Sequence, residues 1–137
     1  MRAVILNFTA DRKNWGCQAT SIGLYRFVSH VLKPHGFSQV ETVLFPHSHI
    51  KDFWQQKIYG TQIREVFSAN DPSAQQLKML EELCQSRFGY HVDKVKNADL
   101  VFFQGEGTMG PSNFYETCRV FALPYLAKNY GISRLYL

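Results

Sequence analysis

The run GEGTMG, residues 105–110, places three glycines at the G-x-G-x-x-G spacing of a dinucleotide-binding loop. It follows the apolar run DLVFFQ at 99–104 and precedes a segment with helical spacing. The backbone amides of such a loop, with a helix dipole behind them, can hold an anionic ligand. Glu106 stands between two of the glycines, so the loop also offers a base or a hydrogen-bond acceptor.

Two features of the sequence disfavour a dinucleotide at this loop. The pattern needs an acidic residue about 20 positions later to hold the ribose hydroxyls, and no Asp or Glu follows Glu116. Pro111 also removes one amide that would face a pyrophosphate. A nucleotide-binding oxidoreductase is therefore the less favoured interpretation. A ligand-contacting loop and a tight turn, in which Glu106 is solvated or caps the next helix, both stay open.

A second candidate site lies in NFTADRKNWGCQATSIG, residues 7–23. A strand-like run ends at the start of this segment, and small residues then open a helix-like segment. Small residues let the backbone approach a ligand, and the hydroxyls of Thr20 and Ser21 can bond to it. A helix N-terminus also favours an anion. We therefore expect the amides of residues 16–20 to bind a phosphate or a carboxylate.

The elements that must position these loops follow from the apolar pattern. Short runs rich in branched and aromatic residues predict buried strands at 2–8, 39–45, 99–104 and 133–137. Segments with apolar residues at helical spacing follow the first run and lie on both sides of the third run. Strands that alternate with helices predict a Rossmann-like three-layer α/β/α fold with a mainly parallel sheet. Residues 1–137 are expected to form one such domain.

Helix boundaries are predicted from capping residues and from breakers. Pro34 and Gly36 are expected to end the helix after the first strand. The next well-defined helix is expected to start with Asp71 as cap and Pro72 in its first turn, and to end before Gly89. The segment 46–70 is predicted to form one or two short helices around Gly60. Pro124 is expected to kink or divide the last helix.

Composition narrows the class of protein. The 137 residues carry a formal net charge of +4, which favours anionic ligands. The basic residues are scattered singly, so nucleic-acid binding is not expected. The three cysteines form no C-x-x-C pair, which favours a reducing, cytoplasmic setting. No apolar run approaches the roughly 18 residues of a membrane span, and none matches a signal peptide.

The two loops together resemble the polysaccharide pyruvyl transferase family. NWGCQATS after the first strand is similar to the family's first helix start, and ADLVFFQGEGT is similar to its strand before a glycine triplet. Glu106 stands where the family has its middle glycine. The matching positions are Asn14, Gly16, Cys17, Gln18, Ala19, Asp99, Gly105 and Gly107.

This resemblance implies one half of a protein with two Rossmann-like domains, arranged as in GT-B glycosyltransferases. The implied reaction moves a pyruvyl group from phosphoenolpyruvate, or another anionic donor, onto saccharide hydroxyls. It uses no cofactor and no metal. The site would be completed by a C-terminal domain or by a second copy of the chain. A non-catalytic binding or interaction domain with the same fold is the alternative.

Residue roles follow from the resemblance and from the loop chemistry. Glu106 is expected to act as a base or to position a sugar hydroxyl, Asn113 to contact the acceptor, and Arg12 or Lys13 to provide charge. The predicted substrate-binding residues are Arg12, Asn14, Gly16, Cys17, Gln18, Thr20, Gly105, Gly107, Thr108 and Asn113.

Other candidates have simpler explanations. Cys17 at a helix start could be a nucleophile, but a small packed residue explains it as well. His47 and His49 could form part of a metal pair, but loop histidines without a special role are more common. Trp15 and Tyr115 could stack on a sugar ring, or they could pack at the rim of the core.

Overall fold

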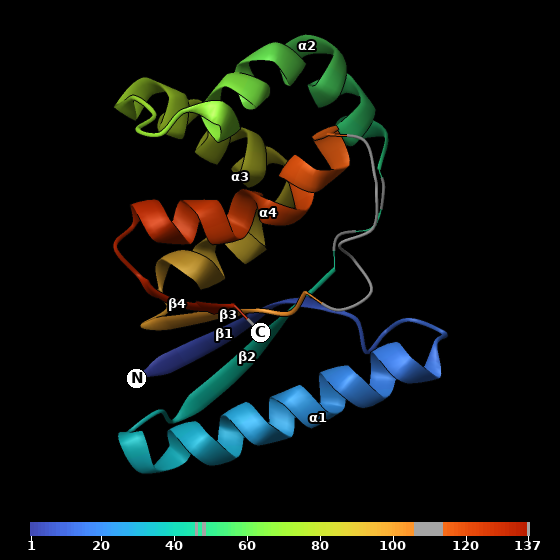
Figure 1. Cartoon of the computed structure of the whole chain (residues 1–137), viewed down its shortest axis with the longest axis vertical. Coiled ribbons are helices and arrows are strands. Elements are labelled where there is room, and N and C mark those ends of the chain that lie inside the picture. The colour runs from blue at the N-terminus through green and yellow to red at the C-terminus, as the bar shows by residue number, and fades with distance from the viewer. Residues whose placement is uncertain (46, 48, 106–113, 137) are drawn as a thin grey trace.

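The computed structural model describes residues 1–45, 47, 49–105 and 114–136, with only the backbone at 114–119 and 133–136. Its four described strands form one parallel sheet in the order β2-β1-β3-β4. The strands are β1 (Arg2–Phe8), β2 (Gln39–Leu44), β3 (Leu100–Phe103) and β4 (Ser133–Tyr136). The predicted class, a Rossmann-like parallel α/β fold, is confirmed (Figure 1).

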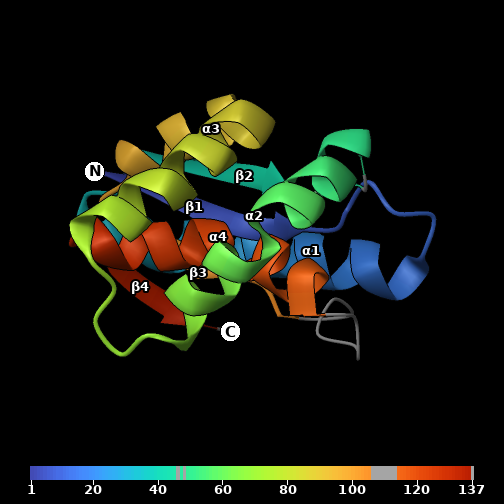
Figure 2. The same cartoon turned by 90° about the horizontal axis from the view of Figure 1, so that it is seen from above.

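Helices cover both faces of this sheet. The described helices are α1 (Trp15–Leu32), α2 (Ile50–Ser68), α3 (Ala74–Lys96) and α4 (Phe114–Asn129), and a short 3-10 turn, Lys33–His35, follows α1. Among them α1 covers one face, and α3 and α4 lie over the other (Figure 1). The remaining helix, α2, packs on α3 and α4 and forms an outer layer (Figure 1, Figure 2).

The sheet is apolar on both faces because alternate strand residues point to opposite helix layers. In β1, Ala3 and Ile5 pack in the cluster under α1, together with Val28 of that helix. Val4 and Leu6, which alternate with them, pack in the cluster formed with α3 and α4. This alternation explains why the strands read in the sequence as continuous apolar runs.

The limits of α3 differ from the prediction. Ser73, not Asp71, is the N-cap: its hydroxyl accepts from the amide of Gln76, whose side chain accepts from the Ser73 amide. Such a reciprocal pair satisfies two helix-end donors, which a lone Asp71 cap would not do. Phe88 has non-helical backbone angles (φ −135°, ψ 30°), so a first helical segment stops at a kink beside Gly89, close to the predicted end. A second helical segment continues from this kink to Lys96, and both segments lie within α3.

Two further segments form longer helices than expected. Residues of the uncertain segment 46–70 form the single helix α2, which continues through Gly60. The last helix, α4, keeps Pro124 inside it and is not divided. The predicted end of α1 is confirmed, because Gly36 adopts a left-handed backbone (φ 83°) after the 3-10 turn. Among the described residues, no helix is both long and apolar enough to cross a bilayer.

Candidate functional site

The strand order creates a switch point between β1 and β3. The chain leaves β1 toward β2 on one side, and β3 then pairs with the other side of β1. In open parallel sheets, ligands bind at the carboxyl edge where such connections diverge. The two candidate loops, after β1 and after β3, begin at this shared edge (Figure 1). The structure therefore brings together the beginnings of both loops singled out in the sequence.

Three buried polar side chains join the ends of these strands to α1. Thr9 follows β1, Ser21 lies in α1, and Gln104 follows β3, and each is at most 2% exposed. The side-chain nitrogen Nε2 of Gln104 donates to Ser21 Oγ at 2.9 Å and to Thr9 Oγ1 at 3.3 Å. The Thr9 amide donates to Ser21 Oγ at 3.1 Å, and the two hydroxyls lie 3.0 Å apart. We call Thr9, Ser21 and Gln104 the buried polar triad.

Asn7 strengthens the same junction from within β1. Its backbone is left-handed (φ 64°), a conformation that Asn tolerates better than most residues. The pairing between β1 and β2 shifts register between Ile5 and Phe8, and Asn7 lies within that irregularity. Its Nδ2 donates to the Gln104 carbonyl oxygen at 2.5 Å. A strained, buried polar residue at a strand end is a feature that clusters at functional sites.

Most of this junction was not predicted from the sequence. The Ser21 hydroxyl was expected to bond to a ligand, but it is buried and bonds to Thr9 and Gln104. No role was predicted for Asn7, Thr9 or Gln104. The available signal was positional: a polar residue directly follows or closes each of two apolar strands, in ILNFT and in VFFQ.

The start of α1 is held by Asn14. Its Oδ1 accepts from the amides of Gly16 at 2.9 Å and Cys17 at 3.2 Å, which caps the helix. The Gln18 side chain donates to the Arg12 carbonyl oxygen at 2.8 Å and folds the loop back on the helix. The amides expected to bind an anion are therefore already bonded within the chain. An anion at Gly16 and Cys17 would have to displace the Asn14 side chain.

Gly16 and Thr20 have local roles in the same turn. A Cβ at residue 16 would lie 3.2 Å from Asn14 Oδ1, so a larger side chain would press on the cap. The Thr20 hydroxyl donates to the Gly16 carbonyl oxygen at 2.7 Å, the usual back-bond of a helical threonine. A ligand that used this hydroxyl would compete with that bond.

Arg12 is the predicted cation that the structure describes most fully. Its guanidinium carbon lies 4.7 Å from the centre of the Phe45 ring, and its amide donates to the Thr9 carbonyl oxygen at 3.0 Å. An arginine stacked on an aromatic ring keeps its charge and its outer N–H groups available. Asp11 lies in the same loop and pairs with His47 at 3.0 Å. The loop after β1 therefore presents charges of both signs.

Several predicted site residues fall where the structure gives no description. Glu106, Gly107, Thr108 and Asn113 lie outside the described residues, and only the backbone of Tyr115 is described. Gly105 is described and directly follows Gln104 of the buried polar triad. The second loop is thus placed by its first residue only, and its proposed chemistry stays a prediction.

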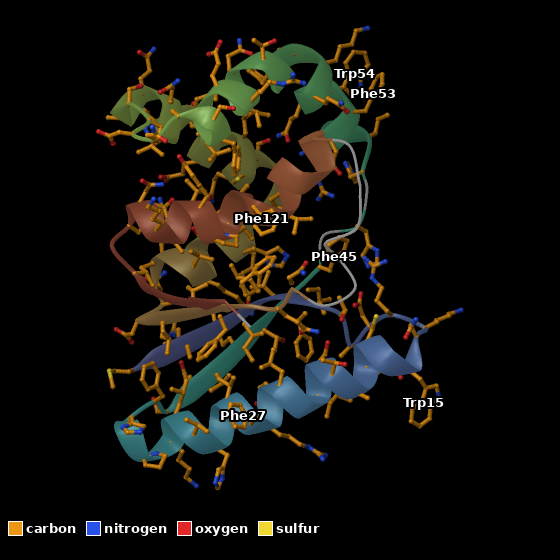
Figure 3. The ribbon with its side chains drawn as sticks, viewed as in Figure 1. Trp15, Phe27, Phe45, Phe53, Trp54 and Phe121 are labelled. Carbon is orange, nitrogen blue, oxygen red and sulfur yellow. The ribbon has the colours of Figure 1, made fainter. Side chains whose placement is uncertain are left out.

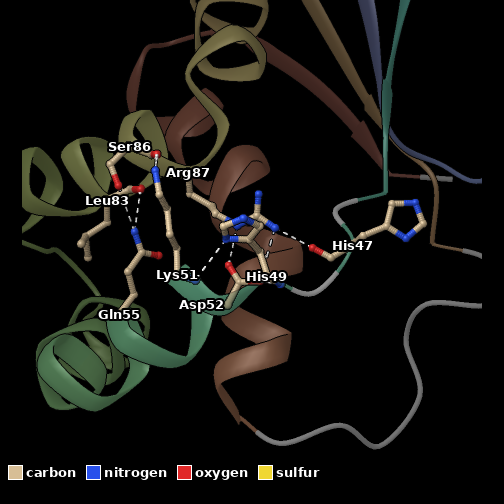
Figure 4. Close-up of polar contacts among 8 residues, drawn as sticks. All are labelled: His47, His49, Lys51, Asp52, Gln55, Leu83, Ser86 and Arg87. Atoms are coloured by element: carbon tan, nitrogen blue, oxygen red, sulfur yellow. Dashed lines mark hydrogen bonds and ion pairs between the residues drawn. The ribbon is translucent and has the colours of Figure 1, made fainter.

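The two histidines singled out in the sequence have structural partners. His49 caps α2: its Nδ1 accepts from the Lys51 amide at 3.1 Å, and Asp52 accepts from the His49 amide at 2.8 Å (Figure 4). Arg87 donates to Asp52 at 2.7 Å and to the His47 carbonyl oxygen at 2.5 Å, which ties this segment to α3. Across the described residues, no group of three His, Cys, Asp or Glu side chains is arranged to hold a metal ion.

The described thiols differ in environment. Cys84 is buried, and desolvation raises its pKa to about 12, so this thiol stays protonated and unreactive. Cys17 is half-buried at the start of α1. It is a free thiol beside the capped amides.

Comparisons with protein-family models, with curated proteins and with solved structures found no match. A Rossmann-like parallel α/β fold is established for this chain, with a buried polar triad at its switch point.

Proposed function

We propose that this chain is a sugar- or polysaccharide-modifying transferase similar to the pyruvyl transferases, or a part of one. Its ligand would lie at the carboxyl edge between β1 and β3. The observation that carries the proposal is the buried polar triad at that edge. It fixes the ends of both strands and the start of α1 relative to one another. Rigid placement of two loops around one crevice is what a small-molecule site requires.

Charge supports an anionic donor. The chain carries a net charge of +4, and Arg12 and Lys13 stand in the loop after β1. Phosphoenolpyruvate has a phosphate and a carboxylate, and guanidinium groups can bind both kinds of anion in a bidentate manner. In this proposal the side chains of Arg12 and Lys13 hold the donor, and Asn14 keeps the helix start in shape.

The reaction in this proposal forms a ketal. A proton adds to C3 of phosphoenolpyruvate, two sugar hydroxyl oxygens bond to C2, and the bond from C2 to the phosphate oxygen breaks. One hydroxyl proton balances the proton gained at C3, and the other leaves with phosphate. A base is needed to accept a hydroxyl proton. The sequence assigns that role to Glu106, with Asn113 on the acceptor and Thr108 beside the glycines.

A specific observation favours a second candidate function, a binding domain without catalysis. Asn14 already occupies the amides of Gly16 and Cys17, as in a helix that holds no anion. Such a domain would bind a saccharide or a protein partner and would not turn over a donor. The two functions differ in whether phosphate is released from phosphoenolpyruvate.

Ligand binding by the full chain tests the proposal. Phosphoenolpyruvate, nucleotide-sugars and NAD would be titrated in thermal denaturation, and phosphate release would be measured with a saccharide mixture. A ligand at 100 times its Kd stabilises the fold by about 2.7 kcal/mol. We expect phosphoenolpyruvate to stabilise the protein and Arg12→Gln to raise the Kd for phosphoenolpyruvate about tenfold or more.

The matched control is Arg64→Gln on α2, which should leave donor binding unchanged. Binding of phosphoenolpyruvate without phosphate release would favour the binding domain. Stabilisation by NAD but not by phosphoenolpyruvate would contradict the proposal, as would equal donor binding by the Arg12→Gln variant.

A further inference from the structure

The solvent side of α2 carries large apolar side chains. They are 52–65% exposed, and we call them the outer face of α2: Ile50, Phe53, Trp54 and Ile58. The spacing i, i+3, i+4 and i+8 places them on one side of the helix. Ile63 and Val66, near the other end of the helix, are buried against the molecule. Figure 3 shows Phe53 and Trp54 projecting from α2 at the outer end of the molecule.

Packing among the described residues does not require this face. Packing on α3 and α4 uses the opposite side of the helix, where the Tyr125 hydroxyl also donates to the Val66 carbonyl oxygen at 3.2 Å. Isolated exposed apolar residues are ordinary, but a contiguous group marks an interaction surface. The rings of Phe53 and Trp54 lie edge to face, 5.7 Å apart, so the group is contiguous.

The charge beside this face is positive. In residues 50–60 the acidic residue is Asp52, which is buried and bonded to Arg87. The Lys57 ammonium lies 5.7 Å from the centre of the Trp54 ring, whereas the Lys51 ammonium turns toward α3 and donates to the Ser86 carbonyl oxygen at 3.2 Å (Figure 4). The outer face of α2 therefore combines aromatic and branched side chains with Lys57, while Asp52 points inward.

We propose that the outer face of α2 docks this protein on an anionic lipid surface. Helices that lie in a membrane interface have this composition, with Trp, Phe and other apolar side chains among the acyl chains and lysines at the headgroups. Tryptophan is favoured at that depth, and lysine stems extend to reach phosphates. Anionic lipids complement Lys57, which accounts for the positive charge as well as for the apolar side chains.

The available area argues against a second copy of the chain as the occupant. Aromatic side chains bury about 150–250 Å² each, so four half-exposed side chains, two of them isoleucine, offer at most on the order of 400–500 Å². A standard protein interface buries about 800 Å² on each partner. Self-association would also bring Lys57 of two copies together. A lipid surface needs no such area and attracts this lysine.

Helix α1 also exposes apolar side chains, but on two sides: Ile22 and Tyr25 on one, Phe27 and Val31 on the other. Phe27 is 61% exposed, as much as the residues on α2. It is therefore a matched control for aromatic exposure on another helix.

Vesicle sedimentation of the full chain tests the proposal. The vesicles are phosphatidylcholine alone, and phosphatidylcholine with one third phosphatidylglycerol. We expect binding to the anionic vesicles, weakened about tenfold by Trp54→Ser and also reduced by Lys57→Gln and by high salt. Phe27→Ser should bind as the wild type does. Far-UV circular dichroism of each variant checks that it is folded.

The two tryptophans allow a second readout. In a Trp15→Phe protein, emission comes from Trp54 alone and should shift to shorter wavelength on anionic vesicles. In a Trp54→Phe protein, emission from Trp15 should not shift. The proposal is overturned by absence of binding to anionic vesicles, by equal loss in Phe27→Ser, or by a shift from Trp15 instead. A dimer in analytical ultracentrifugation that Trp54→Ser dissociates would also overturn it in favour of self-association.

Discussion

Two regions of this molecule reverse the usual distribution of polar and apolar side chains. At the switch point of the sheet, the buried polar triad is polar and lies in the interior. On α2, the outer face is apolar and lies in solvent. In the first region the chain supplies every partner, since Thr9, Ser21 and Gln104 bond to one another. In the second region the described residues leave the apolar side chains half-exposed, and we propose a lipid surface as their partner.

The two regions differ in their role: the buried polar triad stabilises the fold, whereas the outer face of α2 is exposed to a partner. Removing one member of a buried polar group leaves the others without a partner and destabilises the protein. Truncating an exposed apolar side chain changes the free energy of unfolding little. Unfolding measurements should therefore respond at the buried polar triad, and surface-binding measurements at the outer face of α2.

Gln104→Leu is expected to have the largest effect on stability. It leaves the Thr9 and Ser21 hydroxyls buried with fewer partners, and we expect a loss of about 3 kcal/mol in the free energy of unfolding. Urea denaturation followed by circular dichroism measures it. Gln62→Leu, at an exposed position of α2, is the matched control and should stay within about 0.5 kcal/mol. Equal effects of the two substitutions on the free energy of unfolding would show that the buried polar triad does not stabilise the fold.

Ser21→Ala compares a buried hydroxyl with its exposed neighbour. Ser21 bonds to Thr9 and Gln104, whereas the Thr20 hydroxyl bonds only locally to the Gly16 carbonyl oxygen. We expect Ser21→Ala to lower the free energy of unfolding by about 1.5 kcal/mol and Thr20→Ala to change it by less than about 0.5 kcal/mol. A larger loss of stability in Thr20→Ala than in Ser21→Ala would contradict the claim that the buried hydroxyl contributes more than the exposed one.

Asn14→Ala extends the comparison to the start of α1, where a polar side chain is exposed but serves backbone amides. Loss of the cap should lower the free energy of unfolding by about 1 kcal/mol. Asn14→Ser, which can still cap, should retain most of the stability, and the same denaturation experiment compares the two. If both substitutions leave stability unchanged, the cap does not hold the helix start.

Trp54→Ser is expected to have the smallest effect on folding. The side chain is on the outer face of α2, so the free energy of unfolding should stay within about 0.5 kcal/mol of the wild type. The same substitution is expected to give a large loss in vesicle binding. A clear destabilisation without any loss of vesicle binding would mean that Trp54 packs in the fold and does not serve a surface.

Periodicity in the sequence was enough to predict the fold class. Each strand was a short apolar run, and each joined the parallel sheet within about one residue of its predicted limits. Helix ends were harder, because a cap depends on a reciprocal pair such as Ser73 and Gln76, and not on one residue type. The end predicted before Gly89 corresponds to the kink at Phe88, after which a second helical segment of α3 continues to Lys96.

The sequence predicted where the candidate site lies, but not the hydrogen bonds within it. The sequence located the loop after β1 and the loop after β3 at one edge, since parallel strands end on the same side. It did not reveal that Asn14 bonds to the amides of Gly16 and Cys17. Nor did it reveal the buried polar triad, because hydrogen bonds between residues 83 or 95 positions apart require the folded sheet.

The most direct test of the central claim is an amide ¹H–¹⁵N NMR titration of the full chain with phosphoenolpyruvate. If the edge between β1 and β3 is the donor site, the amides around Arg12 and Gly16 and that of Gly105 should shift with a single Kd. The amides of α2 should not move. A titration in which no amide moves, or in which the shifts fall on α2 and α3, would contradict the account.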